Sequence, residues 1–382
     1  MGDDMATACH LCNKDALITL QEYGEFKRVT SDCRIWPAGG VLCYCTACGS
    51  VQKKVDAVWQ KEAEEIYQCY EIYHQSGGED QTVFSEGGEA SGRSHKLLER
   101  FHETMAMGAT GHLLDMGCGN GQLLSAFRSY YPLWHLSGTE INGKYKERIE
   151  AIPGVDKLYI NELPDLEKRF DLITMVHFLE HIPRPSTLLT QVHERLTENG
   201  LLLVQVPAYT MNPFDLLIAD HCTHFSPTSL SCLLEENGFD IISIHQSWIP
   251  KELTVIAGKS AGEICDRRHR SMDGIEKINQ TVNWLKEVRD TARLVHKSKP
   301  FALFGTSIAA TWLFNELNGE VDYFADEDRN RIGRNILGIP VRHPKHLDSN
   351  THLFIGLAPS TAEVIYEKYK NYSFTCYYPV RR

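Results

Sequence analysis

No stretch of the sequence approaches the ~20 consecutive apolar residues that a membrane-spanning helix needs, so a membrane protein is not expected. The first residues, Met1-Gly2-Asp3-Asp4, lack the cationic and apolar regions of a signal peptide. Ala6 also breaks the pattern for N-myristoylation. These absences predict a soluble, cytoplasmic protein with no membrane partner.

Positive charge is also scarce. The 382 residues include 39 Lys and Arg against 50 Asp and Glu, which gives a formal net charge of −11. An acidic chain is not attracted in bulk to nucleic acid, and no basic stripe with interleaved aromatic residues offsets this charge. A small-molecule substrate is therefore expected, and a nucleic-acid partner is not. The length favours two or three domains and predicts no particular oligomeric state.

Cysteine is plentiful but unevenly placed, because six of the twelve cysteines precede residue 50. In a reducing compartment, clustered thiols are more typical of metal ligands than of disulfides. Two C-x-x-C pairs predict one structural zinc ion held by four thiolates. The expected ligands are Cys9, Cys12, Cys45 and Cys48. Cys33 and Cys43 lie between the pairs and are alternative ligands. A redox role is the weaker alternative, since neither pair lies in a βαβ pattern.

The segment 113–122 joins a strand to a helix through a glycine-rich turn. Asp115 lies near the end of the apolar strand, and Gly117, Gly119 and Gly121 follow at alternate positions. Glycine adopts the φ/ψ values of such a turn and lets a ligand approach the backbone without a Cβ in the way. The spacing differs from the G-x-G-x-x-G turn that binds nicotinamide dinucleotides.

Further strands follow in alternation with helical patterns. They are expected at 135–140, 157–161, 170–176 and 200–206. Glu140 closes the first of them about twenty residues after the turn, a distance typical of a carboxylate that binds ribose. The alternation predicts a doubly wound α/β sheet whose ligand lies at the carboxyl ends of the strands.

Helical patterns at 51–73 and 94–105 flank a polar, glycine-rich loop at 75–92, which we interpret as a lid over the substrate. Beyond the sheet, a charged helical segment leads to a second Rossmann-like α/β pattern. That pattern has one glycine, Gly305, where a nucleotide site would want three. It is therefore interpreted as a structural or substrate-side domain.

These motifs resemble those of class I S-adenosylmethionine-dependent methyltransferases. The resemblance rests on the acid before the G-x-G-x-G turn, on Glu140, and on Phe170-Asp171 leading into Leu179-Glu180-His181. It implies S-adenosylmethionine as the cofactor, with the glycines against its methionine part and Glu140 on the ribose hydroxyls. The expected cofactor contacts are Asp115, Gly117, Gly119, Asn120, Gly121, Glu140, Glu162 and His177.

The order of the parts is similar to that of the three-part C-methyltransferases that act on nucleotide-linked deoxysugars, over nearly the whole chain. The resemblance implies an α/β protein: a class I doubly wound sheet with an N-terminal zinc-binding module and a C-terminal Rossmann-like domain. The expected parts are a zinc-binding module at 1–55, a helical connector with the lid loop at 56–95, a methyltransferase domain at 96–258, a helical linker at 259–298 and the Rossmann-like domain at 299–382.

In that family a Tyr-His-Glu-His-Leu-Ser-Tyr-Phe-Ser motif carries the catalytic base. The segment 218–226, Ile-Ala-Asp-His-Cys-Thr-His-Phe-Ser, resembles it. The match implies His221 as the general base and Asp220 as the carboxylate that orients it. Ile218 and His224 replace the two tyrosines, so the contacts to a sugar have changed. The expected acceptor contacts are Tyr70, Tyr73, His181 and His224.

Three functions are compatible with these motifs. The first is C-methylation of a nucleotide-linked keto-sugar, in which the base makes an enolate. The second is O- or N-methylation of a glycan precursor or another small acceptor. In the third, the zinc module binds RNA or protein and the core methylates a macromolecule, which the acidic charge disfavours.

Overall fold

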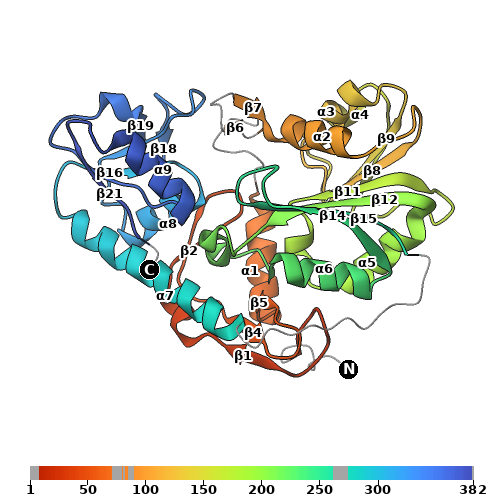
Figure 1. Ribbon diagram of the computed structural model, residues 1–382, viewed down its shortest axis with the longest axis horizontal. Coiled ribbons are helices and arrows are strands. Elements are labelled where there is room, and N and C mark those ends of the chain that lie inside the picture. The colour runs from red at the N-terminus through yellow and green to blue at the C-terminus, as the bar shows by residue number, and fades with distance from the viewer. Residues whose placement is uncertain (1–7, 71–79, 81, 85–89, 261–273, 381–382) are drawn as a thin grey trace.

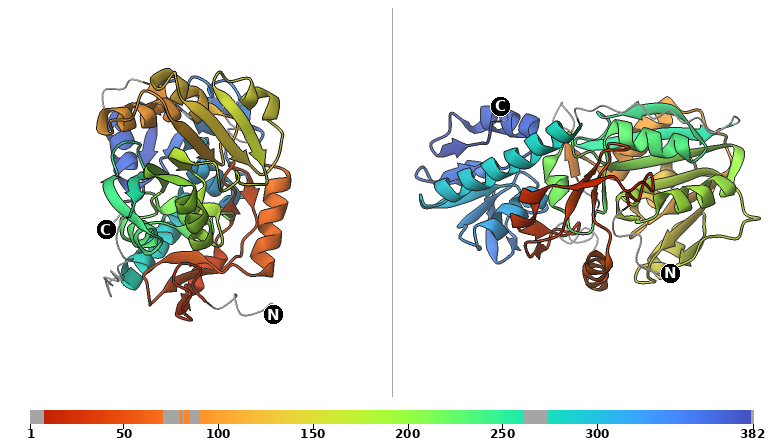
Figure 2. Two further views of the ribbon diagram at one scale, coloured as in Figure 1. Left: turned by 90° about the vertical axis from the view of Figure 1, so that its right-hand side faces the viewer. Right: turned by 90° about the horizontal axis from the view of Figure 1, so that it is seen from below.

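The computed structural model describes residues 8–70, 80, 82–84, 90–260 and 274–380. Two α/β units lie at opposite ends of the molecule, and the N-terminal segment lies between them (Figures 1 and 2). Among these described residues, no helix is long and apolar enough to cross a bilayer.

The larger unit is built on a seven-stranded sheet with the order β10-β9-β8-β11-β12-β15-β14. All strands run parallel except β15, which is antiparallel to both of its neighbours. The strands are β8 (His112–Met116), β9 (His135–Glu140), β10 (Val155–Ile160), β11 (Phe170–Val176), β12 (Leu196–Pro207), β14 (Phe239–His245) and β15 (Glu252–Lys259). The strands expected after the glycine-rich turn are therefore confirmed as β9 to β12.

Helices cover both faces of this sheet (Figure 1). One face is covered by α2 (Arg93–Thr104) and α3 (Gln122–Tyr130), and the other by α5 (Pro185–Arg195) and α6 (Pro227–Glu236). The short α4 (Lys146–Glu150) packs beside β10. The order of strand addition reverses between β8 and β11, and a sheet of this kind binds its ligand in the crevice at that point.

The N-terminal segment forms a second sheet, whose last strand comes from far along the chain. The order is β1-β4-β5-β13, with β1 (Leu17–Thr19), β4 (Leu42–Cys45), β5 (Val51–Lys53) and β13 (Thr223–His224). A two-stranded ribbon of β2 (Arg28–Val29) and β3 (Ile35–Trp36) and the 3-10 helix η2 (Gln21–Glu25) complete the segment. The zinc module expected at 1–55 therefore shares its sheet with the segment that contains His221.

The single helix expected at 51–73 is wrong in its first part. The helix α1 spans Ala57–Gln68 and begins after Asp56, whose carboxylate accepts hydrogen bonds from the N–H groups of Val58 and Trp59. Residues 51–53 instead form β5, because they pair with β4 on one side and with β13 on the other. Of the expected lid loop, the described part contains β6 (Thr82–Phe84) paired with β7 (Ala90–Gly92); the rest lies outside the described residues.

The C-terminal unit has a six-stranded sheet with the order β18-β19-β17-β16-β20-β21, parallel except between β18 and β19. Its elements are α7 (Gly274–Val295), β16 (Phe301–Phe304), α8 (Ile308–Glu316), β17 (Tyr323–Ala325), β18 (Asn335–Ile336), β19 (Ile339–Arg342), η6 (Pro344–His346), β20 (His352–Phe354), α9 (Pro359–Tyr369) and β21 (Thr375–Tyr377).

This unit packs on the N-terminal segment through α8. The rings of Phe26 and Trp312 pack edge to face with their centroids 6.0 Å apart. The side-chain amide of Asn315 donates to the carbonyl of Trp36 at 2.8 Å. One apolar core contains Phe26, Trp312 and Phe214, which lies seven residues before His221. The N-terminal segment is thus fixed to both α/β units.

Candidate active site

The glycine-rich turn follows β8 with a left-handed backbone. The φ angles of Gly117, Gly119 and Gly121 are +68°, +59° and +84°. A Cβ on Gly117 would lie 2.4 Å from a ring carbon of Phe178, so glycine is required there by both φ and space. The carboxylate of Glu140 accepts hydrogen bonds from the N–H of Gly119 at 2.6 Å and of Ile141 at 3.0 Å. The end of β9 therefore supports the turn that follows β8.

Asp115 lies beneath this turn. Its carboxylate accepts a hydrogen bond from the Thr174 hydroxyl at 2.7 Å. Burial raises the pKa of Asp115 to about 7, and burial also raises the pKa of Glu140. Both carboxylates lie in the crevice formed by the carboxyl ends of the parallel strands.

A cavity of ≈ 1460 Å³ opens at these strand ends. All three parts of the chain contribute to its lining. The contributions include residues 31–33 of the N-terminal segment, the loops after β8, β9, β10 and β11, and residues 307–309, Leu357, Ala358, Ser360 and Thr361 of the C-terminal unit. Of the expected site residues, those that line it are Asp115, Gly117, Asn120, Glu140, Glu162, His177, Tyr70, His181 and His221. Gly119 and Gly121 complete the turn behind the lining, and Tyr73 lies outside the described residues.

His221 borders the cavity and is held by Asp215. The Nδ1–H of His221 donates to Oδ1 of Asp215 at 2.7 Å, and His224 donates from its own Nδ1 to Oδ2 of the same carboxylate at 2.7 Å. The other ring nitrogen of His221, Nε2, therefore remains for a ligand. Asp215 lies in the 3-10 helix η5 (Pro213–Leu217) and was not predicted, since no motif marks it.

Two predicted roles are corrected by this geometry. Asp220 does not orient His221; its carboxylate accepts hydrogen bonds from the N–H and the hydroxyl of Ser31, at 2.9 and 2.5 Å. Asp220 lies in the turn before β13, and its Oδ2 also lies 3.5 Å from Nδ1 of His181. His224 is fully buried and lies outside the cavity lining, so it supports Asp215 and does not contact an acceptor.

The pKa values of His221 and His224 are shifted in opposite directions. Burial alone would lower the pKa of His221, but the hydrogen bond and charge of Asp215 outweigh burial, and the pKa lies above its ordinary value of 6.5. For His224, burial and the charge of Lys53 prevail and lower the pKa to about 4. Burial would raise the pKa of Asp215, yet the two histidines hold it far below its usual range. Asp215 is thus an anion that favours the protonated form of His221.

His181 lies in η4 (Leu179–His181) and packs against His221. The two imidazole rings pack edge to face with their centroids 4.6 Å apart. Nδ1 of His181 lies 2.8 Å from the hydroxyl of Tyr67 and 3.1 Å from the carbonyl of Asp220. Burial and the neighbouring charge of His221 lower the pKa of His181. Tyr67 belongs to α1 and was not predicted; the tyrosines expected to contact the acceptor were Tyr70 and Tyr73.

A second group of buried charges was not predicted. Nδ1 of His177 lies 3.2 Å from Glu180, its Nε2 lies 3.1 Å from Glu252, and Arg93 contacts both His177 and Glu252. Burial would lower the pKa of His177, as would Arg93, but the two carboxylates raise it overall. Glu252 opens β15 and stands in no recognisable motif, so only the fold brings it here.

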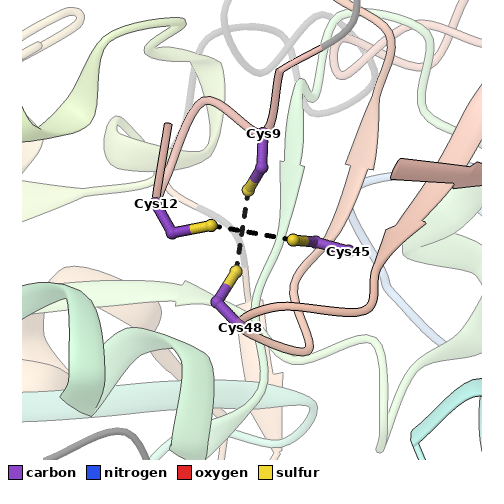
Figure 3. Close-up of side chains that lie close together, drawn as sticks. All are labelled: Cys9, Cys12, Cys45 and Cys48. Atoms are coloured by element: carbon purple, nitrogen blue, oxygen red, sulfur yellow. Dashed lines mark hydrogen bonds between the residues drawn. The ribbon is translucent and has the colours of Figure 1, made fainter. Parts of the chain in front are cut away.

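The four predicted metal ligands converge on one point (Figure 3). Their sulfur atoms all lie within 4.8 Å of one another, with Cys9 to Cys48 at 3.6 Å and Cys12 to Cys45 at 3.7 Å. A tetrahedral ion with metal–sulfur bonds of about 2.3 Å would hold its ligands roughly 3.8 Å apart, so the four thiols fit such an ion. Gly49, at φ +76°, turns the second knuckle. Cys33 and Cys43 take no part in the cluster.

Comparison with known proteins places this geometry in a class. Residues 90–244, which run from β7 into β14, match the family described as "Methyltransferase domain". The matched range contains the glycine-rich turn, Glu140 and His221. The chain therefore contains an S-adenosylmethionine-dependent methyltransferase domain with the class I arrangement of its sheet.

Particular relatives are distant. C-methyltransferase NovU from Streptomyces niveus is 26% identical over 175 residues, which is 43% of this chain and 41% of that protein. The chain thus spans less than half the length of this curated relative. Among solved structures, the calicheamicin-biosynthesis methyltransferase CalO1 is 17% identical (TM-score 0.36, 44% of this chain and 53% of that chain). The mitomycin 7-O-methyltransferase MmcR is 16% identical (TM-score 0.37, 44% of this chain and 53% of that chain).

Proposed function

We propose that this protein transfers the methyl group of S-adenosylmethionine to a carbon atom next to a ketone, on a nucleotide-linked sugar, with His221 as the general base. The observation that carries the proposal is the hydrogen bond of His221 to Asp215, because His221 borders the same cavity as the glycine-rich turn. Similarity of the domain to a C-methyltransferase supports the same reaction type.

For the cofactor, we propose that the turn at 117–121 receives the methionine part and that Glu140 receives the ribose hydroxyls. A carboxylate offers about four acceptor positions. The N–H groups of Gly119 and Ile141 use two of them, so Glu140 still has lone pairs for two hydroxyls. Further proposed contacts are Asp115, Asn120, Glu162 and His177, all of which line the cavity.

The proposed reaction consists of a proton transfer, then a methyl transfer, then release of the proton. Nε2 of His221 removes a proton from the carbon next to the ketone, and the C–H electron pair becomes an enolate. The enolate carbon attacks the methyl carbon, the sulfur–methyl bond breaks, and its electron pair stays on sulfur as S-adenosylhomocysteine. His221 then releases its proton to solvent. The protein contributes alignment of the two ligands and a base of suitable pKa.

The acceptor is proposed to be large. A single drug-sized ligand fills a pocket of roughly 300–1,000 Å³, whereas this cavity measures ≈ 1460 Å³. The cavity also extends from His221 to residues 307–309 of the C-terminal unit. Space for both a cofactor and an extended acceptor supports a sugar that carries a nucleotide.

For the cysteine cluster, we propose a zinc ion bound by Cys9, Cys12, Cys45 and Cys48. Zinc prefers four thiolates in tetrahedral geometry, and the sulfur separations fit that arrangement. Four protein ligands leave no position for a substrate, so the ion would be structural and would supply folding free energy.

The experiment that tests the function uses S-adenosylmethionine with a ¹³C-labelled methyl group and a panel of nucleotide-linked keto-sugars. We expect a product methyl signal coupled to a sugar carbon. An O-methyl signal would instead support the second function, O-methylation of another small acceptor. Absence of transfer to every acceptor, with S-adenosylhomocysteine still bound, would contradict the proposed substrate class.

A further inference from the structure

The segment that contains His221 is joined to the cysteine module by backbone hydrogen bonds. Thr223 pairs with Gln52 and His224 with Val51, and the N–H of Lys53 donates to the carbonyl of Cys222 at 2.9 Å. The strand β5 follows directly on the second knuckle, where the N–H of Cys45 donates to the carbonyl of Ser50 at 2.9 Å. The second knuckle therefore sets the position of residues 222–224.

The first knuckle reaches the same segment through a side chain. His10 stands between the ligands Cys9 and Cys12, and its Nε2 lies 2.7 Å from the hydroxyl of Thr223. This single contact spans 213 residues of sequence. Both C-x-x-C turns thus converge on β13.

The other end of the segment is held by further N-terminal side chains. Lys53, only 1% exposed, donates from Nζ to the carbonyl of Leu216 and to the hydroxyl of Tyr23. The indole N–H of Trp59 donates to the carbonyl of Ala219 at 2.9 Å. The segment 215–224 is therefore anchored along its length, and each of these anchors comes from the first 60 residues.

Inside the segment, the contacts lead to the base. Backbone pairing fixes His224, whose Nδ1 holds one oxygen of Asp215 while the other oxygen holds Nδ1 of His221. The cofactor turn is supported separately, by Glu140 and Thr139 from β9 and by Phe178 after β11. The contacts from β13 through His224 and Asp215 thus reach His221 without including the cofactor turn.

We infer that the cysteine module is a positioning device for the catalytic base: its two knuckles place β13, and β13 places Asp215 and His221. This inference rests on the proposed role of His221. Thr223 and His10 then have a positioning function, because their contact joins the first C-x-x-C turn to the segment 215–224. Neither the C-x-x-C motif nor the motif at 218–226 indicates this function.

The test removes this contact and leaves the cysteines untouched. Thr223→Val deletes the hydroxyl at constant shape, and Thr223→Ser restores it. Thr197→Val is the matched control, because that hydroxyl also bonds a side chain, Asp171 at 3.2 Å, but at the opposite end of β12 from the cavity. For each variant we would measure kcat, the Kd of S-adenosylhomocysteine, bound zinc, and the ¹⁵N imidazole signals of His221, assigned with His221→Gln.

We expect Thr223→Val to lose roughly 10-fold in kcat, the lower range for loss of a hydrogen bond that orients a functional group, with zinc content and Kd unchanged. The imidazole signals of His221 should shift, and Thr223→Ser should restore both kcat and the signals. Unchanged kcat and unchanged signals in Thr223→Val would overturn the inference, as would an equal loss in cofactor affinity. If no acceptor is methylated by the wild-type protein, the proposed function fails, while the imidazole shift still decides whether the module positions His221.

Discussion

At the scale of single residues, His221 is the group whose loss should separate chemistry from binding. His221 is 3% exposed and its Nδ1 bonds Asp215, so only Nε2 is left for the proposed acceptor. We expect His221→Ala to lower turnover by about two to four decades, the usual range for a general base, while the Kd of S-adenosylhomocysteine stays within about 3-fold. Steady-state kinetics and calorimetry measure the two effects. His135→Ala, at a histidine that is 60% exposed, is the control and should behave as wild type.

The pH dependence of kcat/KM should show the effect of Asp215 on the pKa of His221. A base acts only when it is neutral, so kcat/KM should rise with pH through the pKa of His221, which lies above 6.5. Burial opposes that raised pKa, whereas Asp215, Glu180 and Asp220 support it, and His181 faces the ring as a fourth titratable group. Asp215→Asn leaves the burial and removes the nearest charge. We therefore expect the rising limb to move to lower pH and the plateau to fall; a limb that does not move would exclude Asp215 as the partner of the base.

Site residues could be predicted from the sequence where they belong to a short motif. Such motifs mark the four cysteines and His221. In the structure the cysteines lie in one cluster and His221 lies at the cavity. Asp215 was missed because it bonds His221 through the shape of a 3-10 turn, and sequence proximity pointed to Asp220 instead. Glu252 was missed for the same kind of reason, since the fold alone brings β15 to His177.

At the scale of elements, the contact between the end of β9 and the turn after β8 leads to a prediction about the affinity for the cofactor. Glu140 supports the turn through the N–H of Gly119 and is proposed to bind the ribose. Glu140→Gln keeps the size but removes the charge from these hydrogen bonds, each worth about 1.5–3 kcal/mol for a charged acceptor, so we expect S-adenosylmethionine to bind roughly 10- to 100-fold more weakly by calorimetry. Glu147→Gln on the exposed face of α4 is the control. Wild-type affinity in Glu140→Gln would contradict the ribose assignment.

Elements with a strong local pattern were predicted well, and those made by distant partners were not. The alternating strands and helices of the larger unit follow their hydrophobic periods, and β9 to β12 lie within a few residues of their expected ranges. Residues 51–53 read as the start of a helix but form β5, because β4 and β13 supply strand partners on both sides. A strand partner some 170 residues away leaves no periodicity in the local sequence.

At the scale of the whole molecule, the parts expected as separate domains are tied together at one cavity. The N-terminal segment contributes residues 31–33 and the C-terminal unit residues 307–309 to a lining that also includes the glycine-rich turn. One apolar core joins Phe26, Phe214 and Trp312, one from each part of the chain. An acceptor that fills this cavity would contact all three parts, so the arrangement of the units, and not the methyltransferase fold alone, would select it.

Metal removal should therefore affect more than the first fifty residues. Structural zinc contributes about 10–16 kcal/mol of binding free energy in small modules, comparable to the roughly 5–15 kcal/mol that stabilises a whole domain. Because β13 completes the sheet of the cysteine module, a chelator should increase amide hydrogen exchange at residues 51–53 and also at 222–224, while the central strands β8 and β11 stay protected. Exchange followed by mass spectrometry, with zinc added back as the control, measures this. If the increase stopped before residue 54, the module would fold independently, and the sheet shared with β13 would contribute little to the stability of the catalytic segment.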